Sequence, residues 1–260
     1  GRDWEQISAA DLRGFLGRKK PSPHRYHRLL ASWSKFWSFL RDVQKLPVGN
    51  PPAELKRPKL PARLPKYLET PDIAKLLNAA HNDKNPDRGL RNWALLAFLY
   101  GTGARIGEVL SLTFDRISYA DGLPASVRVI GKGDKERVIP LSSIAQRALV
   151  QWLKVRRTEG HPTSPHVWSY LTGKHRGQPL SVRTVQAMTS SAAKRAGLDP
   201  AKVSPHKMRH SYATALVEQG RSLHEIGTIL GHENPATTAI YGRVKARQLE
   251  QAASALPDVL

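Results

Sequence analysis

The segment LPVGNPPAELKRPKLPARLPKYLE, residues 46–69, constrains the fold of this chain more than any other stretch. Its six prolines remove backbone donors and fix φ, so neither a continuous helix nor a central strand can run through it. We therefore expect an extended, basic linker over residues 47–68. The chain of 260 residues would then fold as two domains, a small one over residues 1–46 and a larger one over residues 69–260.

The small domain is predicted to be helical. Residues 8–20 indicate a short helix capped by Ser8. Residues 23–41 indicate a longer helix, because large apolar side chains recur there at helical spacing. The apolar stripe consists of Leu29, Leu30, Trp33, Phe36, Trp37 and Leu40. We interpret the stripe as core, and since two helices are few for a domain, we expect that a partner helix precedes residue 1.

The large domain is predicted to combine helices with one β-hairpin. SVRVIGKGDKERVIPL, residues 126–141, has two β-branched runs around a Gly-Lys-Gly-Asp turn, which is typical of a hairpin. A helix is expected to begin at Thr70 as the cap, with Pro71 at its first position. Helices are predicted at residues 70–80, 90–103, 104–112, 143–157, 181–196, 205–219, 222–230, 235–241 and 244–255.

Charge is the strongest signal in the composition. The chain carries 41 lysines and arginines against 21 acidic residues, a formal net charge of +20. Residues 1–66 hold 15 basic and 5 acidic side chains, so the charge is densest in the N-terminal quarter. An excess of this size favours a polyanionic partner. The alternative is a solvated basic surface, since phosphate attraction alone carries no sequence preference.

Several classes of protein are excluded by what the sequence lacks. It contains no cysteine, so disulfides and thiolate metal sites are excluded. No apolar run approaches the roughly 20 residues that a membrane-spanning helix needs, and no signal-peptide pattern opens the chain. We therefore expect a soluble protein of the cytoplasm.

The stretch SPHKMRHSYAT places His206 and His210 four residues apart, on one face of a predicted helix. A zinc protease needs a glutamate directly after the first histidine, but Lys207 stands there and Arg209 adds a second cation. A zinc site is therefore not expected. His206 and Arg209 also share a helical face, and their donors suit a phosphate. An ordinary surface pair of these two residues is the alternative.

Two further stretches carry residues suited to an anion. TGARIGEVLSL places Arg105 after a glycine turn at a predicted helix start, and Glu108 could orient it from three residues later. GKGDKER places Lys132 at the hairpin tip between glycines, which let the backbone approach a ligand closely. Each has a plain alternative, a surface Arg–Glu pair in the first case and an ordinary basic turn in the second.

LGHENPATTAIYGRV places His232 at a predicted helix end and Tyr241 further along the same stretch. A single tyrosine is most often half-buried packing. Because an unperturbed tyrosine has a pKa of about 10, a tyrosine nucleophile needs a base or strongly positive surroundings.

In this order and spacing, TGARIGEVLSL, VIGKGDKERVIPL, SPHKMRHSYAT and ILGHENPATTAIYGRV resemble the motifs of the tyrosine recombinases, most closely those of the Xer branch. The resemblance covers residues 8–255, and PKLPARLPKYL also looks like the Xer interdomain segment. It implies a mainly α fold with a small antiparallel β-hairpin or sheet. A helical, SAM-like core-binding domain and an α+β catalytic domain would close on DNA as a clamp.

The resemblance implies which residues hold the scissile phosphate. Arg105 and Arg209 would clamp it and stabilise the pentacoordinate transition state, and His232 would hydrogen-bond it. Glu108 matches a supporting acidic position. Fixed positive donors suit this reaction, because the transition state carries more negative charge on its oxygens than the phosphodiester does.

It also implies which residues move protons. Tyr241 would be the nucleophile that forms a 3′-phosphotyrosyl bond, and His206 would accept its proton. Lys132 would be the general acid on the leaving 5′-hydroxyl. It further implies that no metal and no high-energy cofactor is used. The covalent bond keeps the energy of the broken one, so the strand can be rejoined without ATP.

The implied partner is double-stranded DNA with inverted half-sites. Two protomers would bind one site and four would assemble on two sites, alone or with a paralogous recombinase, and residues 244–260 would pack on a neighbour. No membrane partner is expected, and the protein would associate with the nucleoid. Basic residues expected to contact DNA are Arg18, Lys19, Lys20, Arg25, Arg28, Lys35, Lys56, Arg57, Lys59, Lys135 and Lys207.

Two departures from the family pattern and two rival functions stay open. Ala215 stands where the family often has a histidine, and Gly-Arg-Val follows Tyr241 in place of Thr-His-Val. The rivals are a type IB topoisomerase-like enzyme that relaxes DNA, and a sequence-specific DNA-binding protein that has lost catalysis. Xer-like resolution of chromosome dimers during partition and integration or excision of mobile elements are equally open as biological roles.

Overall fold

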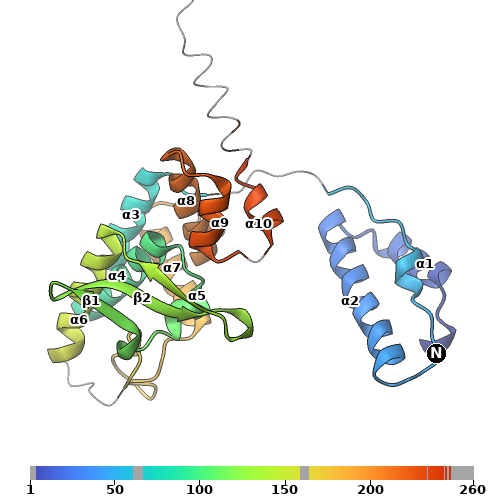
Figure 1. Cartoon of the computed structure of the whole chain (residues 1–260), viewed down its shortest axis with the longest axis horizontal. Coiled ribbons are helices and arrows are strands. Elements are labelled where there is room, and N and C mark those ends of the chain that lie inside the picture. The colour runs from blue at the N-terminus through green and yellow to red at the C-terminus, as the bar shows by residue number, and fades with distance from the viewer. Residues whose placement is uncertain are drawn as a thin grey trace, which may run out of the picture. The chain divides into compact units, whose positions relative to one another are not determined.

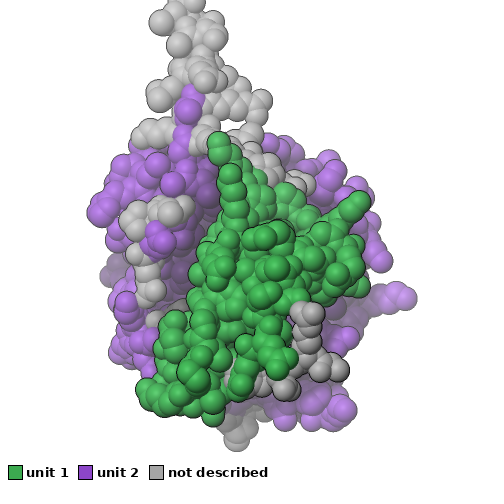
Figure 2. Space-filling model, turned by 90° about the vertical axis from the view of Figure 1, so that its right-hand side faces the viewer, with its two compact units in different colours: residues 1–63 green, residues 64–260 purple. Residues whose placement is uncertain are grey.

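The computed structural model describes residues 4–60, 67–158, 164–232, 234–242, 244 and 246. Its contacts divide the chain into unit 1, residues 1–63, and unit 2, residues 64–260 (Figure 2). As predicted, the described chain is mostly helical with one small antiparallel sheet.

Unit 1 is built around two helices, α1 (Ala9–Lys19) and α2 (Pro23–Asp42). Ser8 caps α1 as predicted, because its hydroxyl accepts from the Asp11 amide while the Asp11 carboxylate accepts from the Ser8 amide. Short 3-10 helices lie before and after them, η1 (Trp4–Gln6) and η2 (Pro51–Glu54). The core of unit 1 consists of Ala9, Leu12, Leu16, Leu30, Trp37 and Leu55.

The predicted linker is not extended throughout. Residues 51–54 form the 3-10 helix η2, which contacts α1 and α2. Pro52 and Leu55 are buried, and Leu55 belongs to the unit 1 core. Prolines at the start of a helical turn lose no hydrogen bond, since the first amides of a turn have no partner within it. A proline-rich segment can therefore still contribute to a core.

Unit 2 carries the rest of the secondary structure (Figure 1). Its α-helices are α3 (Thr70–His81), α4 (Pro86–Thr102), α5 (Ile106–Leu110), α6 (Ser143–Thr158), α7 (Val182–Arg195), α8 (Pro205–Glu218), α9 (Leu223–Leu230) and α10 (Pro235–Ala239). Its strands are β1 (Ile117–Ala120), β2 (Leu123–Ile130) and β3 (Glu136–Pro140), and its 3-10 helices are η3 (Phe114–Arg116), η4 (Lys132–Asp134) and η5 (Pro200–Lys202).

Helix α4 is the centre of unit 2. Its residues from Ala94 to Leu99 are all at most 1% exposed, so it is buried on every side rather than along one stripe. It contacts α3, α6 and α8. Asn85 caps its start and Gly103, with φ of 60°, ends it in the left-handed conformation.

The sheet has the order β1–β2–β3 with both pairings antiparallel. The predicted hairpin is confirmed as β2 and β3, with Val127 opposite Ile139 and Ile130 opposite Glu136. Strand β1 was not predicted, since only Ile117 of its four residues is buried and no apolar alternation marks it. The sheet contacts α5 and α6 through β2.

Several helix boundaries differ from the prediction. Glu69, not Thr70, is the N-cap of α3, so Pro71 falls at the second helical position. Helix α5 ends at Leu110 and covers only five residues. The helix predicted at residues 244–255 lies almost wholly outside the described residues. No helix within the described part of the chain is long and apolar enough to cross a membrane.

Candidate active site

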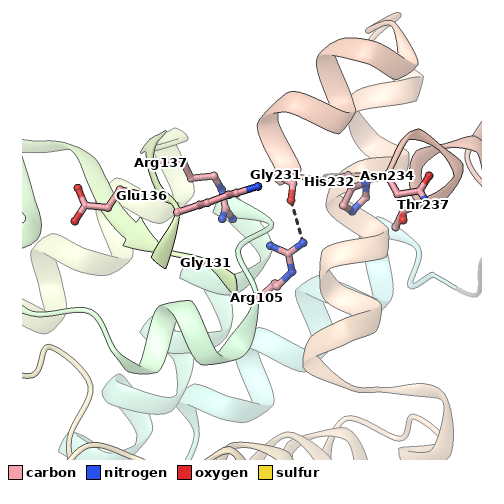
Figure 3. Close-up of a pocket in the computed structure, with 9 residues that line it drawn as sticks. Arg105, Gly131, Glu136, Arg137, Gly231, His232, Asn234 and Thr237 are labelled. Atoms are coloured by element: carbon pink, nitrogen blue, oxygen red, sulfur yellow. Dashed lines mark hydrogen bonds between the residues drawn. The ribbon is translucent and has the colours of Figure 1, made fainter. Parts of the chain in front are cut away.

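The N-cap residue of α5, the β2–β3 turn, β3, the α9–α10 connection and α10 surround one cavity of about 410 Å³ (Figure 3). The lining residues are Arg105, Gly131, Lys135, Glu136, Arg137, Gly231, His232, Asn234 and Thr237. Two glycine turns precede residues that line the cavity. Gly103 ends α4 two residues before Arg105, and Gly231, with φ of 67°, ends α9 directly before His232.

Arg105 is held at two points. Its Nη1 donates to Oε1 of Glu108 at 2.9 Å and its Nη2 donates to the carbonyl of Gly231 at 3.0 Å. The Arg105 amide also donates to Glu108 Oε2, at 2.7 Å. Its side chain is 44% exposed, so the guanidinium is fixed in position but open to the cavity.

Arg209 lies on α8 and is only 5% exposed. Its Nη1 donates to the carbonyl of Gly103 at 2.7 Å, and its Nη2 donates to the carbonyl of Leu230 at 2.8 Å. Burial, and then the charge of Arg105, lowers the pKa of Arg209 to about 10, so it remains a cation at neutral pH. The acceptors for Arg209 and Arg105 include the consecutive carbonyls of Leu230 and Gly231, which brings the two guanidinium groups to the same turn.

His232 follows that turn and lines the cavity. Its Nδ1 hydrogen-bonds Oγ1 of Thr238, a buried α10 residue, at 2.8 Å. The other ring nitrogen, Nε2, is left to contact a ligand. Burial, and then the charges of Arg209 and Arg105, lowers the pKa of His232 to about 4. The imidazole is therefore neutral at physiological pH in this state.

Tyr241 is 1% exposed and packs in a core with Ile226 and Leu230. Its hydroxyl lies 2.5 Å from Nδ1 of His210. The rings of His210 and His206 meet edge to face, with their centroids 4.5 Å apart. Burial raises the pKa of Tyr241 to about 12, although the charge of Arg209 acts in the opposite direction.

Both histidines of α8 have lowered pKa values. Burial, followed by the charges of His206 and Arg209, lowers the pKa of His210 to about 4. Burial and Arg209 also lower the pKa of His206. Among the described residues there is no cluster of three or more histidine, cysteine, aspartate or glutamate side chains that could hold a metal ion.

The structure brings most of the predicted site residues together. Arg105, Glu108, Arg209 and His232 surround the turn at Gly231. The backbone of Lys132 lies in η4 at the hairpin tip, but its side chain lies outside the described residues.

Three contacts were missed by sequence reasoning. Arg137, on β3, donates to both oxygens of Glu108, each at 2.7 Å. Thr238 holds His232, and His210 holds Tyr241. For Arg137 a signal was available, because strand alternation places it on the same face as the buried Ile139.

The residues predicted to contact DNA are mostly exposed. In unit 1 these are Arg18, Lys19, Lys20, Arg25, Arg28, Lys35, Lys56, Arg57 and Lys59, and in unit 2 Lys135 is exposed as well. Lys207 is half-buried, and its Nζ donates to the carbonyl of Ala201 at 2.9 Å. It is therefore less available to a ligand than the other ten.

Comparison with known proteins shows which family this chain matches. The phage integrase family matches residues 66–248. The tyrosine recombinase XerD of Haemophilus influenzae is 34% identical over 252 residues, which cover 95% of this chain and 82% of that protein. XerD of Proteus mirabilis is 35% identical over 257 residues, covering 95% of this chain and 78% of that protein.

Solved structures agree with the fold. The XerH site-specific recombinase bound to palindromic difH substrate, in a post-cleavage complex, matches with a TM-score of 0.76 at 22% identity, over 97% of this chain and 73% of that one. The Tn1549 transposon integrase in complex with circular intermediate DNA matches with a TM-score of 0.67 at 19% identity, over 92% of this chain and 82% of that one.

Proposed function

Because this chain belongs to the phage integrase family, we propose that Tyr241 is the nucleophile with which it cleaves and rejoins DNA. The chain is a tyrosine recombinase, an enzyme of site-specific recombination that works through a covalent tyrosine intermediate. One observation carries the assignment of its site. Arg105 and Arg209, from separate helices, bind the consecutive carbonyls of Gly231 and Leu230, beside His232. That arrangement supports a binding site for one phosphate.

The proposed cleavage step balances without a cofactor. The Tyr241 oxygen bonds to the phosphorus at the 3′ side of the break, and the bond from phosphorus to the 5′ oxygen is broken. His206 takes the proton of Tyr241, and Lys132 supplies a proton to the leaving 5′ oxygen. Rejoining is the reverse, with the 5′-hydroxyl of the exchanged strand attacking the phosphotyrosyl bond.

Arg105, Arg209 and His232 are proposed to bind the non-bridging oxygens of the phosphate. Their donors are fixed before the substrate arrives, by carbonyls in the case of the arginines and by Thr238 in the case of His232. Donors that need no rearrangement stabilise the developing charge most effectively. Glu108 is proposed to orient Arg105 and does not touch the phosphate.

The resting position of Tyr241 does not suit attack, since its hydroxyl is buried against His210. We therefore propose that DNA binding moves Tyr241 out of this contact. His206 then meets the freed hydroxyl as the proton acceptor, because it is the exposed member of the histidine pair. A bound phosphate also offsets the positive charges of the two arginines, which lower the pKa values of the nearby histidines.

The proposed partner is double-stranded DNA, and the palindromic substrate of XerH supports inverted half-sites. We propose that unit 1 is the core-binding domain and unit 2 the catalytic domain, joined by the proline-rich linker as a clamp. Dimers would occupy one site and tetramers two, in the cytoplasm at the nucleoid.

Covalent capture tests the proposed function. The protein and its Tyr241→Phe variant would be incubated with genomic fragments of the source organism, stopped with detergent, and recovered with any attached DNA for sequencing. We expect an adduct at a short inverted repeat with the wild type alone. An adduct with both proteins would overturn Tyr241 as the nucleophile, and Tyr212 would be examined next. Sequence-specific binding without an adduct would favour a DNA-binding protein instead, and relaxation without exchange would favour a topoisomerase.

A further inference from the structure

Glu108 is surrounded by more donors than one arginine supplies. Its Oε1 accepts from Nη1 of Arg105 and Nη1 of Arg137, at 2.9 and 2.7 Å. Its Oε2 accepts from the Arg105 amide and from Nη2 of Arg137, each at 2.7 Å. The Glu108 side chain is 4% exposed, so water does not share in the neutralisation of its charge.

The two arginines divide their contacts unequally. Arg137 gives both terminal nitrogens to Glu108 in a bidentate pair, the strongest arrangement of these groups. Arg105 gives Glu108 one terminal nitrogen and gives the other to Gly231. The Arg137 side chain is 18% exposed and that of Arg105 is 44% exposed. Both arginines line the cavity, and Arg105 is the more exposed of the two and the one with fewer contacts to Glu108.

Arg137 also contributes more than the Arg105 side chain to the lowered pKa of the Glu108 carboxylate. Burial raises the pKa of Glu108, but hydrogen bonds from the Arg137 side chain and then from the Arg105 amide bring it below its ordinary value. The side-chain bond from Arg105 contributes less than either. Arg137 is therefore the main counter-ion of Glu108.

Neutralisation of Glu108 changes the charge that a phosphate meets. The group of Arg105, Arg137, Arg209 and Glu108 contains three cations and one carboxylate. Its net charge at neutral pH is therefore +2. Without Arg137, the same buried carboxylate would draw on Arg105, and one net positive charge would remain. A phosphodiester carries one negative charge, and its pentacoordinate transition state carries more, so the second positive charge acts mainly in the transition state.

The backbone around Arg137 is shaped to hold it there. Figure 3 shows Arg137 entering from the hairpin side of the cavity that Arg105 and Gly231 also line. A Cβ atom added at Gly231 would lie 2.9 Å from Cζ of Arg137, so the turn approaches the guanidinium as closely as only glycine allows.

We propose that Arg137 is a positioning residue for strand cleavage: it neutralises Glu108 and so leaves the Arg105 guanidinium to the scissile phosphate. This inference rests on the function proposed above for the same site. It assigns the β3 arginine a part in the reaction although it is not required to touch the DNA.

The test is a set of substitutions assayed by single-turnover cleavage of a nicked DNA substrate that traps the adduct. Arg137→Gln is expected to slow adduct formation by roughly 10²-fold, within the range for loss of one electrostatic contribution, while the Kd for DNA changes less than about threefold. Arg137→Lys should recover part of the rate, because it keeps the charge but loses the fork. Adding Glu108→Gln to Arg137→Gln should speed cleavage again by about tenfold, because no carboxylate is left to compete for Arg105.

Arg128→Gln is the matched control. Arg128 pairs with Glu136 at 3.7 Å, but both side chains are about half exposed at 48% and 50%. That variant should cleave like the wild type. The proposal would be overturned if Arg137→Gln cleaved at the wild-type rate. It would also be overturned if the double variant cleaved no faster than Arg137→Gln. Thermal melts of each variant separate a loss of folded protein from a loss of rate.

A second readout does not depend on the nucleophile. Binding of inorganic phosphate to the DNA-free protein, followed by ³¹P line broadening, should weaken at least threefold in Arg137→Gln and recover in the double variant. Unchanged phosphate binding would overturn the inference even if the wild type formed no adduct. A wild type that binds phosphate in this pattern without forming an adduct would instead contradict only the proposed cleavage reaction.

Discussion

The hydroxyl of Tyr241 lies 2.5 Å from Nδ1 of His210, on a side chain that is 1% exposed. The proposed nucleophile is therefore buried inside unit 2, and it is not among the residues that line the cavity with Arg105 and His232. Its raised pKa, about 12, favours the neutral phenol in this position. Both features disfavour nucleophilic attack by Tyr241 from this position.

His210→Phe tests whether the hydrogen bond from His210 to Tyr241 stabilises the folded protein. The substitution leaves the buried Tyr241 hydroxyl without its partner, which should destabilise the protein by about 1–3 kcal/mol. Adding Tyr241→Phe should return most of that loss, because both polar groups are then absent. Denaturant unfolding of the two single variants and the double variant measures the coupling. Two independent, additive losses would show that the hydrogen bond does not contribute.

The same variant distinguishes the two histidines in the reaction. His210→Phe should still form the covalent adduct at a rate within about tenfold of the wild type, whereas His206→Phe should lose roughly 10²-fold or more, as expected for a general base. Single-turnover cleavage gives both numbers. The reverse order would make His210 the proton acceptor and His206 the supporting ring.

Stability should fall as the pH drops from about 6.5 towards 4. An unfolded histidine has a pKa of about 6.5, whereas burial and neighbouring cations lower those of His210 and His232 to about 4 in the fold. The folded protein thus binds fewer protons in this window, so its stabilisation is complete above the unfolded pKa and is lost below it. Urea unfolding across this range checks the slope, and replacing both histidines with glutamine should flatten it. A wild-type slope of zero would contradict the lowered pKa values.

Lys132→Ala should slow cleavage by roughly 10²–10⁴-fold, as expected for loss of a general acid. A substrate with a 5′-bridging phosphorothiolate has a leaving group that needs no proton, so its cleavage by Lys132→Ala should approach that by the wild type. Lys135→Ala, three residues along the same hairpin, tests the other candidate acid, and its cleavage rate should not depend in this way on the leaving group. Equal defects on both substrates would move the acid elsewhere, with Lys135 as the next residue to examine.

DNA affinity should depend steeply on salt. Each phosphate neutralised adds about 0.9 to the slope of log K against log salt concentration. Replacing the exposed Lys19 and Lys20 with alanine should reduce that slope by about 2 while the cleavage position stays the same. Fluorescence anisotropy over a KCl series measures the slope. Lys75→Ala, next to Asp72 on α3, serves as the control; an equal change there would indicate a nonspecific charge effect.

The sequence predicted the elements of the site better than their contacts. Arg105, Arg209 and His232 lie in motifs whose order and spacing identify them. Arg137 also lies in one of these motifs, VIGKGDKERVIPL, but its role was not predicted, because strand alternation shows that it faces inwards but not which carboxylate it meets. Its partner Glu108 belongs to another element and is reached only through the packing of β2 against α5.

An element of the fold was predictable where its own residues carry a clear sequence signal. The buried helix α4 has an apolar run with a glycine end, and the hairpin has β-branched runs around a turn. Strand β1 has neither, since it owes its pairing to β2 and buries one side chain. In the linker, proline content predicted extended backbone, but burial of Pro52 and Leu55 against the unit 1 helices favoured a 3-10 turn.

The arginine acceptors at Gly103 and Gly231 have a consequence for engineering. Both are main-chain carbonyls of glycines that end α-helices in the left-handed backbone conformation. Replacing neighbouring side chains therefore does not remove them. A Cβ atom at Gly103 would overlap the ring of Tyr212, and one at Gly231 would crowd Arg137. A library built to redirect this enzyme to new target sequences can therefore vary exposed basic residues of unit 1 widely, provided that these two glycines stay fixed.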